Sequence, residues 1–389
     1  MTCSLRLSAA AALLLFPLTH AAAAETPAPA TLPGLLKDAD IAVSGVVDAS
    51  WDYADVDGGP GFHVFDTSQN SFSLHQLNLT VAHQPVKGLG LLVNTVLGDD
   101  ARILNGNATR DWDLTQAFVQ YACGNGLVYM AGRFVTLAGA ETINPAGNIN
   151  ASRSLLFFNQ PLVHTGARVA WAFNDAFTMT AGIVNSANNG VISGAFVGKT
   201  DNNTSKTAEL QLALTPFKPL QVLLTGYSGN EDTQAAGAGR QRNDTLDLVV
   251  NLAASDALSF AVNGDYFAQK SLIGGSVDGR GVAGYANYKI SRFRVGVRAE
   301  YLDFDGAITT QPGAAANPLL NAAGTGTGRG WMREETLTLG YSPGNDIELI
   351  GELRNDQVDT GVFVLPARDA GAPLNNDQYT TTLKLIYKF

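Results

Sequence analysis

Apolar and polar residues alternate along the chain from Asp40 to Phe389. Strict alternation is the period of a β-strand whose two faces differ in polarity. Segments rich in Gly, Asn, Asp and Ala interrupt the pattern, so each run predicts a strand and each interruption a turn or loop. The clearest runs place apolar residues at every second position of Ile41–Tyr53, Ala208–Leu214, Leu246–Leu252, Phe293–Tyr301 and Ile347–Leu353.

The predicted connections alternate between short and long. The short ones lie near His83–Gly88, Cys123–Gly126, Asn174–Ala176, Pro216–Pro219, Ala254–Asp256, Ile290–Arg292 and Ser342–Asp346. The long ones lie near Ala54–Asn70, Asp99–Arg110, Leu137–Pro161, Ser186–Asn203, Gly229–Gln241, Gln269–Gly279, Asp305–Trp331 and Gln357–Asp377. Tight periplasmic turns and longer external loops are typical of an outer-membrane β-barrel. We therefore predict a transmembrane antiparallel up-and-down β-barrel of about 16 strands, with both termini in the periplasm.

Three of the predicted strands have poorly separated faces. They are Ser71–His83, Leu220–Tyr227 and Gly281–Lys289. Aromatic residues gather near strand ends, as expected for the interfacial girdles of a barrel. In a soluble β-sandwich, the alternative that also alternates, aromatic residues more often lie in mid-strand.

The C-terminal run, Tyr379–Phe389, ends the sequence on an aromatic residue. A barrel can end on such a strand, because its last strand closes against the first and leaves no edge. The pattern resembles the closing strand of bacterial outer-membrane barrels, so the barrel-assembly machinery is an expected partner. The expected assembly signal comprises Leu383, Leu385, Tyr387 and Phe389.

The first 24 residues have the features of a secretory signal peptide. Arg6 supplies a positive charge, Leu7–Leu18 a short apolar run, and Ala22–Ala24 a small-residue cleavage site. The run is too short to span a membrane as a helix. Residues 25–39, with three prolines, predict a periplasmic lead-in, which leaves residues 40–389 for the barrel.

Charge and cysteine content exclude some partners. The chain has 25 basic and 35 acidic residues, and removal of Arg6 with the signal peptide leaves 24 against 35, a net charge of −11. Such acidity argues against nucleic acid as a partner. Cys123 would be the one cysteine left, so no intramolecular disulfide is expected.

Charged residues opposite the apolar faces would point into the lumen. A barrel of about 16 strands is too wide for side chains to fill, so it leaves an aqueous channel whose charged lining sorts solutes. For any single residue, a pair that stiffens the wall is the alternative. The predicted pore-lining residues are Arg133, Arg168, Arg298, Glu300, Glu352, Arg354 and Asp356.

The long connection 137–161 carries the apolar quartet Leu155–Phe158. An apolar cluster on an exposed loop is unfavourable unless it is buried. One hypothesis is that this loop folds into the barrel and narrows the channel; the alternative is that it packs on the rim or on a neighbouring subunit. The predicted constriction residues are Glu141, Asn144, Asn148 and Arg153.

The sequence predicts neither an active site nor a metal or cofactor site. The chain beyond the signal peptide has His63, His75, His83 and His164, which form no recognisable Ser/His pattern, although sequence distance alone cannot exclude one in space. The histidines and Cys123 lack metal-ligand spacing, and no glycine-rich phosphate loop follows a strand into a helix. We expect no enzymatic activity and no cofactor.

Several short motifs resemble one family. Gly132-Arg133-Phe134, Gly139-Ala140-Glu141 and Asn150-Ala151-Ser152-Arg153-Ser154 are similar, in order and spacing, to the "putative beta-barrel porin-2, OmpL-like" group of outer-membrane proteins. So are Arg298-Ala299-Glu300-Tyr301 with Asp303, and Gly351-Glu352-Leu353-Arg354 with Asp356. The resemblance implies a gram-negative outer-membrane barrel with channel activity and no particular substrate.

Two functions follow from these observations. The first is a porin for passive diffusion of small hydrophilic solutes, narrowed by the 137–161 loop and by charged lumen residues. The alternative is a non-conducting structural or adhesive barrel that binds partners through its external loops. Outer-membrane lipid is the expected environment. Many 16-stranded porins form trimers, so a homotrimer is an expectation for which the sequence identifies no interface.

Overall fold

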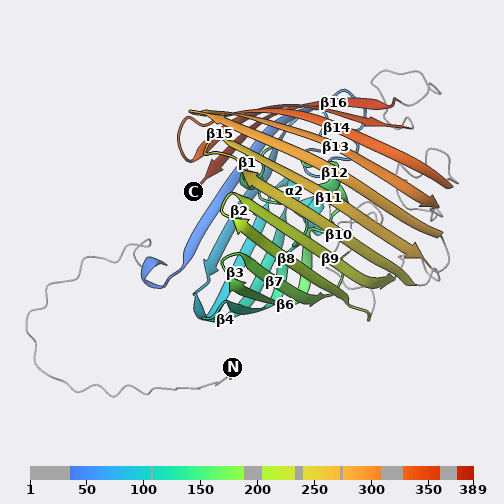
Figure 1. The fold of residues 1–389 in the computed structure, drawn as a ribbon. Coiled ribbons are helices and arrows are strands. Elements are labelled where there is room, and N and C mark those ends of the chain that lie inside the picture. The colour runs from blue at the N-terminus through green and yellow to red at the C-terminus, as the bar shows by residue number, and fades with distance from the viewer. Residues whose placement is uncertain are drawn as a thin grey trace, which may run out of the picture.

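Sixteen strands form one closed antiparallel sheet in the computed structural model, which describes residues 36–106, 108–187, 204–232, 240–271, 275–307, 327–359 and 375–389 (Figure 1). Each strand pairs with its neighbours in sequence, and the last pairs with the first. The strands are β1 (Ala42–Ala54), β2 (Ser71–His83), β3 (Lys87–Leu97), β4 (Trp112–Cys123), β5 (Leu127–Val135), β6 (Val163–Asn174), β7 (Phe177–Val184), β8 (Thr207–Phe217), β9 (Leu220–Asp232), β10 (Arg240–Ala253), β11 (Leu258–Ser271), β12 (Gly275–Ile290), β13 (Phe293–Ala307), β14 (Thr327–Tyr341), β15 (Ile347–Val358) and β16 (Asp377–Lys388). The predicted fold class and strand number are confirmed.

The barrel closes between β16 and β1. Val46 pairs with Lys388 and Ala54 with Thr380, and beyond the ladder the amides of Gly45 and Phe389 each donate to the carbonyl of the other, at 2.8 and 3.0 Å. Both edges of the sheet are thereby satisfied, which a spanning sheet requires because the hydrocarbon offers no water to unpaired backbone groups. Leu383, Leu385, Tyr387 and Phe389 are all exposed on the outward face. Their role as an assembly signal stays a prediction.

Short turns lie at the end of the barrel where the C-terminus is drawn in Figure 1. The connections at the other end are longer, except between β11 and β12: the predicted long connection Gln269–Gly279 is wrong, because β11 ends at Ser271 and β12 begins at Gly275. Among the described residues, two of these connections contain helices that alternation did not predict. The segment between β3 and β4 contains α2 (Asp99–Asn105), and the segment between β5 and β6 contains η1 (Pro145–Gly147) and α3 (Leu155–Asn159). No helix among the described residues is long and apolar enough to cross a membrane.

The three strands with poorly separated faces are all present, as β2, β9 and β12. In β2 the register shifts between Asp48 and Ala49 of the partner strand β1, which marks a bulge. The consecutive residues His75 and Gln76 are both buried there. A bulge adds one residue to one strand and breaks the two-residue period, which explains why the pattern was unclear in the sequence.

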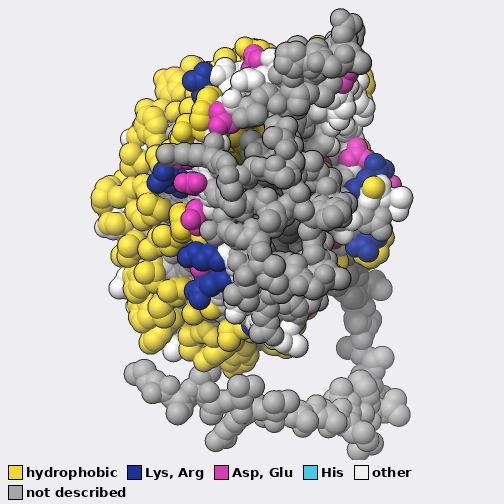
Figure 2. All heavy atoms as spheres, turned by 90° about the vertical axis from the view of Figure 1, so that its right-hand side faces the viewer, with side chains coloured by type: hydrophobic (Ala, Val, Ile, Leu, Met, Phe, Trp, Pro, Cys, Tyr) yellow, Lys and Arg dark blue, Asp and Glu magenta, His cyan; other side chains and the backbone are white. Residues whose placement is uncertain are grey.

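The outer wall of the barrel is apolar. Figure 2 shows hydrophobic side chains spread over this wall, with charged side chains near the rim of the mouth. Exposed aromatic residues lie near both ends of the strands, for example Trp112 and Tyr379 near the external ends and Tyr288 and Phe293 near the short turns. An apolar band between two sets of aromatic residues is typical of a barrel whose middle is surrounded by lipid.

Candidate functional site

The barrel interior is the candidate functional site, because the segment between β5 and β6 folds into it. We call residues 136–162 the inward loop. Its amide at Leu137 donates to the Tyr227 hydroxyl on β9, at 2.8 Å, and its carbonyl at Leu137 accepts from Gln211 on β8. Gly139 then turns the chain with a φ of 94°, a left-handed conformation that favours glycine. The loop thus leaves β5 and contacts the inner face of β8 and β9.

The next contacts hold the inward loop to β10 and β11. The amides of Gly139 and Ala140 donate to Asp247 and Asn263, each at 3.1 Å. On the returning side of the loop, Gln160 donates to Asp265 at 2.7 Å. Both limbs of the loop are therefore held by the same patch of the wall.

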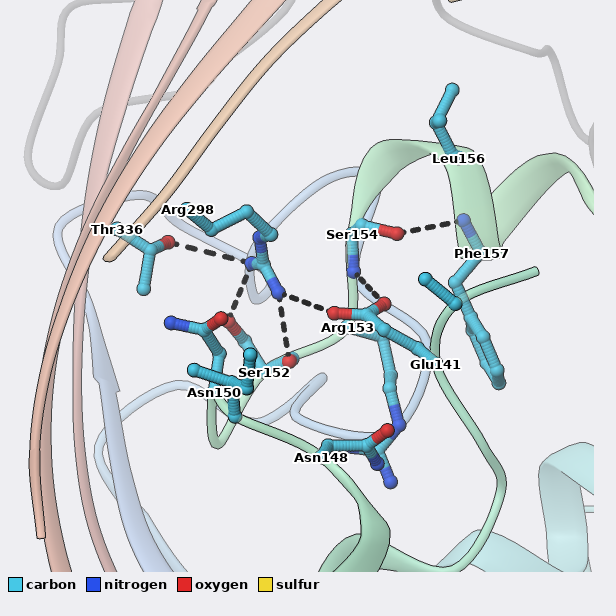
Figure 3. Close-up of polar contacts among 12 residues, drawn as sticks. Glu141, Asn148, Asn150, Ser152, Arg153, Ser154, Leu156, Phe157, Arg298 and Thr336 are labelled. Carbon is cyan, nitrogen blue, oxygen red and sulfur yellow. Dashed lines mark hydrogen bonds and ion pairs between the residues drawn. The ribbon is translucent and has the colours of Figure 1, made fainter. Parts of the chain in front are cut away.

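Arg298 of β13 joins the loop to the wall by charge. Its guanidinium lies 2.8 Å from Glu141 of the loop and 3.0 Å from Glu300 and from Glu334 on the wall. It also donates to the carbonyl of Ser152 at 3.0 Å (Figure 3). The Arg298 side chain is fully buried, so these contacts replace its hydration.

Three further charged wall residues hold the loop backbone. Glu352 of β15 accepts the amides of Ala151 and Ser152 at 2.6 and 2.8 Å. Glu300 accepts the amide of Leu155 at 3.1 Å at the start of α3, and Arg354 donates to the carbonyl of Arg153 at 2.6 Å. Hydrogen bonds to ionised groups are roughly twice as strong as neutral ones.

The other three predicted constriction residues act within the loop. Asn148 accepts the Thr142 amide at 2.8 Å and donates to the Thr142 carbonyl at 2.9 Å. Asn144 caps the short helix η1 by accepting the Ala146 amide. Arg153 donates to the loop carbonyls of Thr142, Ile143 and Ala151. Of the four predicted constriction residues, only Glu141 has a side chain that forms a hydrogen bond or ion pair with the wall among the described residues.

The inward loop buries an apolar core inside the barrel. Leu155 and Leu156 of α3 pack with Phe62 of the segment 55–70 and with wall residues such as Phe304. On the other side, Phe157 packs with Phe65 and with Leu104 of α2. Of the two alternatives for the apolar quartet, the structure thus has the loop inside the barrel. The segment 55–70 and α2 lie there too, which we did not predict, although the apolar Phe62, Val64 and Phe65 could have indicated it.

His63 fixes the segment 55–70 to the wall. Its ring nitrogens lie 2.5 Å from Asp66 and 3.2 Å from Asp356 of β15. Burial, the largest influence, lowers the pKa of His63, and Arg354 lowers it further, but the two carboxylates outweigh both and raise this pKa above its usual value. Burial raises the pKa of Asp66, yet the charge and hydrogen bond of His63 outweigh it and hold that pKa well below its usual range.

Arg168 and Arg133 differ from one another although both were predicted to line the pore. Arg168 faces inward, pairs with Glu209 through contacts of 2.5 and 2.9 Å, and stacks 3.8 Å from the centre of the Phe134 ring. Arg133 is a correction. Its register partner Ala117 lies on the outward face of β4, and the inward position is taken by Phe134, which is buried. The prediction failed because it assumed that an apolar residue at this point faces lipid.

The other predicted pore-lining residues, Arg298, Glu300, Glu352, Arg354 and Asp356, do lie on the inner face, but each is at least 94% buried. The first four hold the inward loop, and Asp356 holds His63 of the segment 55–70, so the charged wall that the sequence indicates is a covered wall. The structure therefore corrects the expectation that these five side chains line open water.

The structure brings Ser50, His75 and Asp100 together, which the sequence spacing did not indicate. The Ser50 hydroxyl lies 2.7 Å from His75 Nε2, and His75 Nδ1 lies 2.9 Å from Asp100. A catalytic triad has these neighbours. Here, however, Asp52 also lies 3.2 Å from Nε2 and accepts the Ser50 hydroxyl. Carboxylates beside both ring nitrogens favour a histidine that donates from both, which cannot take the serine proton.

Comparison with known proteins gives the family. The sequence model described as "Putative beta-barrel porin-2, OmpL-like" matches residues 40–389. The chain belongs to this family. Membership and fold together make it a porin-like outer-membrane barrel. Residues 1–35, with the predicted signal peptide and most of the lead-in, lie outside the described residues. A comparison with curated proteins finds no match.

Solved structures of outer-membrane proteins share the fold of this porin-2 family member. An anion-selective porin from Comamonas acidovorans is 14% identical, with a TM-score of 0.60 over 90% of this chain and 99% of that one. The outer membrane channel DcaP of Acinetobacter baumannii is 12% identical, with a TM-score of 0.58 over 90% and 97%. OprB of Pseudomonas putida is 11% identical, with a TM-score of 0.55 over 91% and 96%. At such identities the likeness concerns the fold.

Proposed function

We propose that the protein is an outer-membrane porin through which small hydrophilic solutes diffuse passively, in a channel narrowed by the inward loop. The observation that carries this proposal is a closed barrel of sixteen strands with an apolar outside and a loop held inside by the wall. A barrel of this width leaves an aqueous channel unless something fills it. The porin and channel that share its fold are further support.

The narrowing role rests on how firmly the inward loop is held. Arg298 and Glu300 of β13 and Glu352 of β15 fix it at two separate wall strands through charged groups. A loop held in this way can define a fixed aperture, whereas a loop free to move would let its size vary. We propose no enzymatic activity, because carboxylates lie beside both ring nitrogens of His75 and leave it unable to take the proton of Ser50.

The experiment that tests this function is single-channel conductance of the refolded protein in a planar bilayer. Discrete open steps are expected. A folded, heat-modifiable barrel that never conducts at any voltage would contradict it. The alternative function, a non-conducting barrel that binds through external loops, is favoured by the apolar core inside the lumen. That function predicts surface binding that is lost when external loops are deleted.

A further inference from the structure

The inner wall of the barrel has a covered part and an open part. The exposure of the fourth residue from the short-turn end differs between two strands. Ile350 of β15 is 4% exposed and packs against Ala151 of the inward loop. Leu223 of β9, at the same position of its strand and also facing inward, is only half-buried. An inward side chain that keeps accessible surface borders open space, whereas Ile350 borders the loop.

The open part lies in the halves of β4–β9 nearer the short turns, because inward side chains nearer the external ends, such as Phe134, His164 and Val184, are buried. Its inward positions follow from the register, which connects Gln120, Met130, Arg168, Gly182 and Glu209 in one row. This row and the inward positions nearer the short turns include several half-buried side chains, beside the buried Ala122, Thr180 and Thr225. These half-buried inward residues are Val128, Met130, Ala170, Gln211, Ala213 and Leu223.

The chemistry of the two parts differs. The covered part carries Arg298, Glu334, Arg354 and Asp356, all paired and buried. In the open part, Arg168 and Glu209 are the charged inward residues of the register rows given above, and they neutralise each other as a bidentate pair. The remaining lining combines amide and hydroxyl groups with methyl-bearing side chains.

We propose that the solute path follows the open wall over β4–β9, and that it admits small uncharged solutes that carry hydroxyl or amide groups beside apolar faces. This inference rests on the proposed porin function and specifies its solute class. A fixed charge beside a narrow path favours ions of the opposite sign. The nearest charges here are paired, and Arg298, Glu300, Glu352 and Arg354 are held against the inward loop, so we expect the channel to discriminate weakly between cations and anions.

Cysteine accessibility tests the position of the path. In a Cys123→Ser background, Leu223→Cys and Ile350→Cys are compared in conducting channels, with Met130→Cys as a second position on the open wall. Thiosulfonate reagents that cannot cross lipid should modify Leu223→Cys and reduce its conductance. Because a covered thiol reacts only after local opening, Ile350→Cys should react at least about tenfold more slowly. Faster reaction at Ile350→Cys than at Leu223→Cys would overturn the proposed path.

The sign of the reagent tests the solute class. Cationic and anionic reagents should modify Leu223→Cys at rates within about threefold of each other, since no net fixed charge favours either. The unmodified channel should have a reversal potential near zero across a potassium chloride gradient. Vesicles containing the protein should swell faster in an uncharged amide or polyol than in a charged solute of similar size. A channel that conducts with strong ion selectivity would overturn this inference and leave the porin function standing, whereas absence of conductance would remove both.

Discussion

At the residue scale, buried charged groups hold the inward loop to the wall of the barrel. Arg298 is the clearest case, because it is fully buried and lies within 3.0 Å of three carboxylates. Two of them, Glu300 and Glu334, belong to the wall, and Glu141 belongs to the inward loop. Removing one partner from a buried ionic cluster leaves the others uncompensated, so a single substitution has a large effect.

We predict that Arg298→Ala destabilises the barrel by about 3–5 kcal/mol, because it leaves Glu141, Glu300 and Glu334 buried without a cation. Urea unfolding of the refolded protein measures this loss. The matched control is Arg242→Ala, since Arg242 pairs with Asp244 at 2.8 Å and its side chain is 58% exposed. The control should cost about 1 kcal/mol or less. Equal losses for the two variants would contradict the fastening role of Arg298.

His63 makes stability depend on pH in a defined direction. Its pKa is raised in the folded protein, so its contribution is fully present below its ordinary pKa of about 6.5 and is lost as pH rises through the raised value. We therefore expect the stability difference between the wild type and His63→Asn to be largest near about pH 5.5 and smaller near about pH 9. Unfolding at both pH values measures it. A difference that stays constant would argue against the ion pairs with Asp66 and Asp356.

At the element scale, the inward loop depends on the wall strands for its position. Little of it is regular structure, and its backbone donors are satisfied by side chains of the wall, such as Glu352 and Glu300. An amide that loses such a partner while buried costs about 1–3 kcal/mol. Loss of the hydrogen bonds to one of these wall residues should therefore make the inward loop more mobile before it unfolds the barrel.

We predict that Glu352→Ala increases the single-channel conductance and its noise, because the amides of Ala151 and Ser152 lose their acceptor. Glu352→Gln keeps one acceptor oxygen and should have a smaller effect, which preserves the test if the alanine variant folds poorly. Leu353→Ala is the control, since the neighbouring Leu353 is 59% exposed on the outward face. Identical conductance in the wild type and Glu352→Ala would mean that the inward loop does not set the aperture.

At the scale of the whole molecule, closure of the sheet decides whether a barrel exists. The last strand meets the first where the ring of Phe389 lies over Gly45, and a Cβ at that position would collide with the ring. The two residues also exchange backbone hydrogen bonds. A side chain at position 45 therefore requires the ring of Phe389 to move.

We predict that Gly45→Val lowers the yield of folded, heat-modifiable barrel, because the new side chain displaces Phe389 from the closing seam. Gly284→Val is the matched control, since a Cβ on Gly284 meets no atom within 4 Å. Refolding into detergent followed by gel mobility with and without heating measures both. Equal yields of the two valine variants would show that the seam tolerates the displacement.

The sequence by itself determined the class of fold. Alternation with period two, an apolar outer set of residues and connections that alternate in length are local properties, and local properties set strand number and direction in an up-and-down barrel. Even the apolar quartet Leu155–Phe158 indicated that its loop must be buried somewhere. The strand β2, one of three with poorly separated faces, was unclear because its bulge at His75 and Gln76 breaks the period that the prediction relies on.

Only the tertiary structure decided what the interior does. Alternation tells which side chains face inward, but it cannot tell which inward side chains a distant loop will cover. Arg298 and Glu352 are separated from the inward loop by more than a hundred residues in sequence, and barrel closure alone brings them to Glu141 and Ala151. A related reason explains why Arg133 faces outward and Phe134 inward. Phe134 packs against Phe118 inside the barrel, which is a contact between different strands. The physical difference is that strands form from local pattern, whereas the lining of the lumen depends on contacts between segments far apart in the chain.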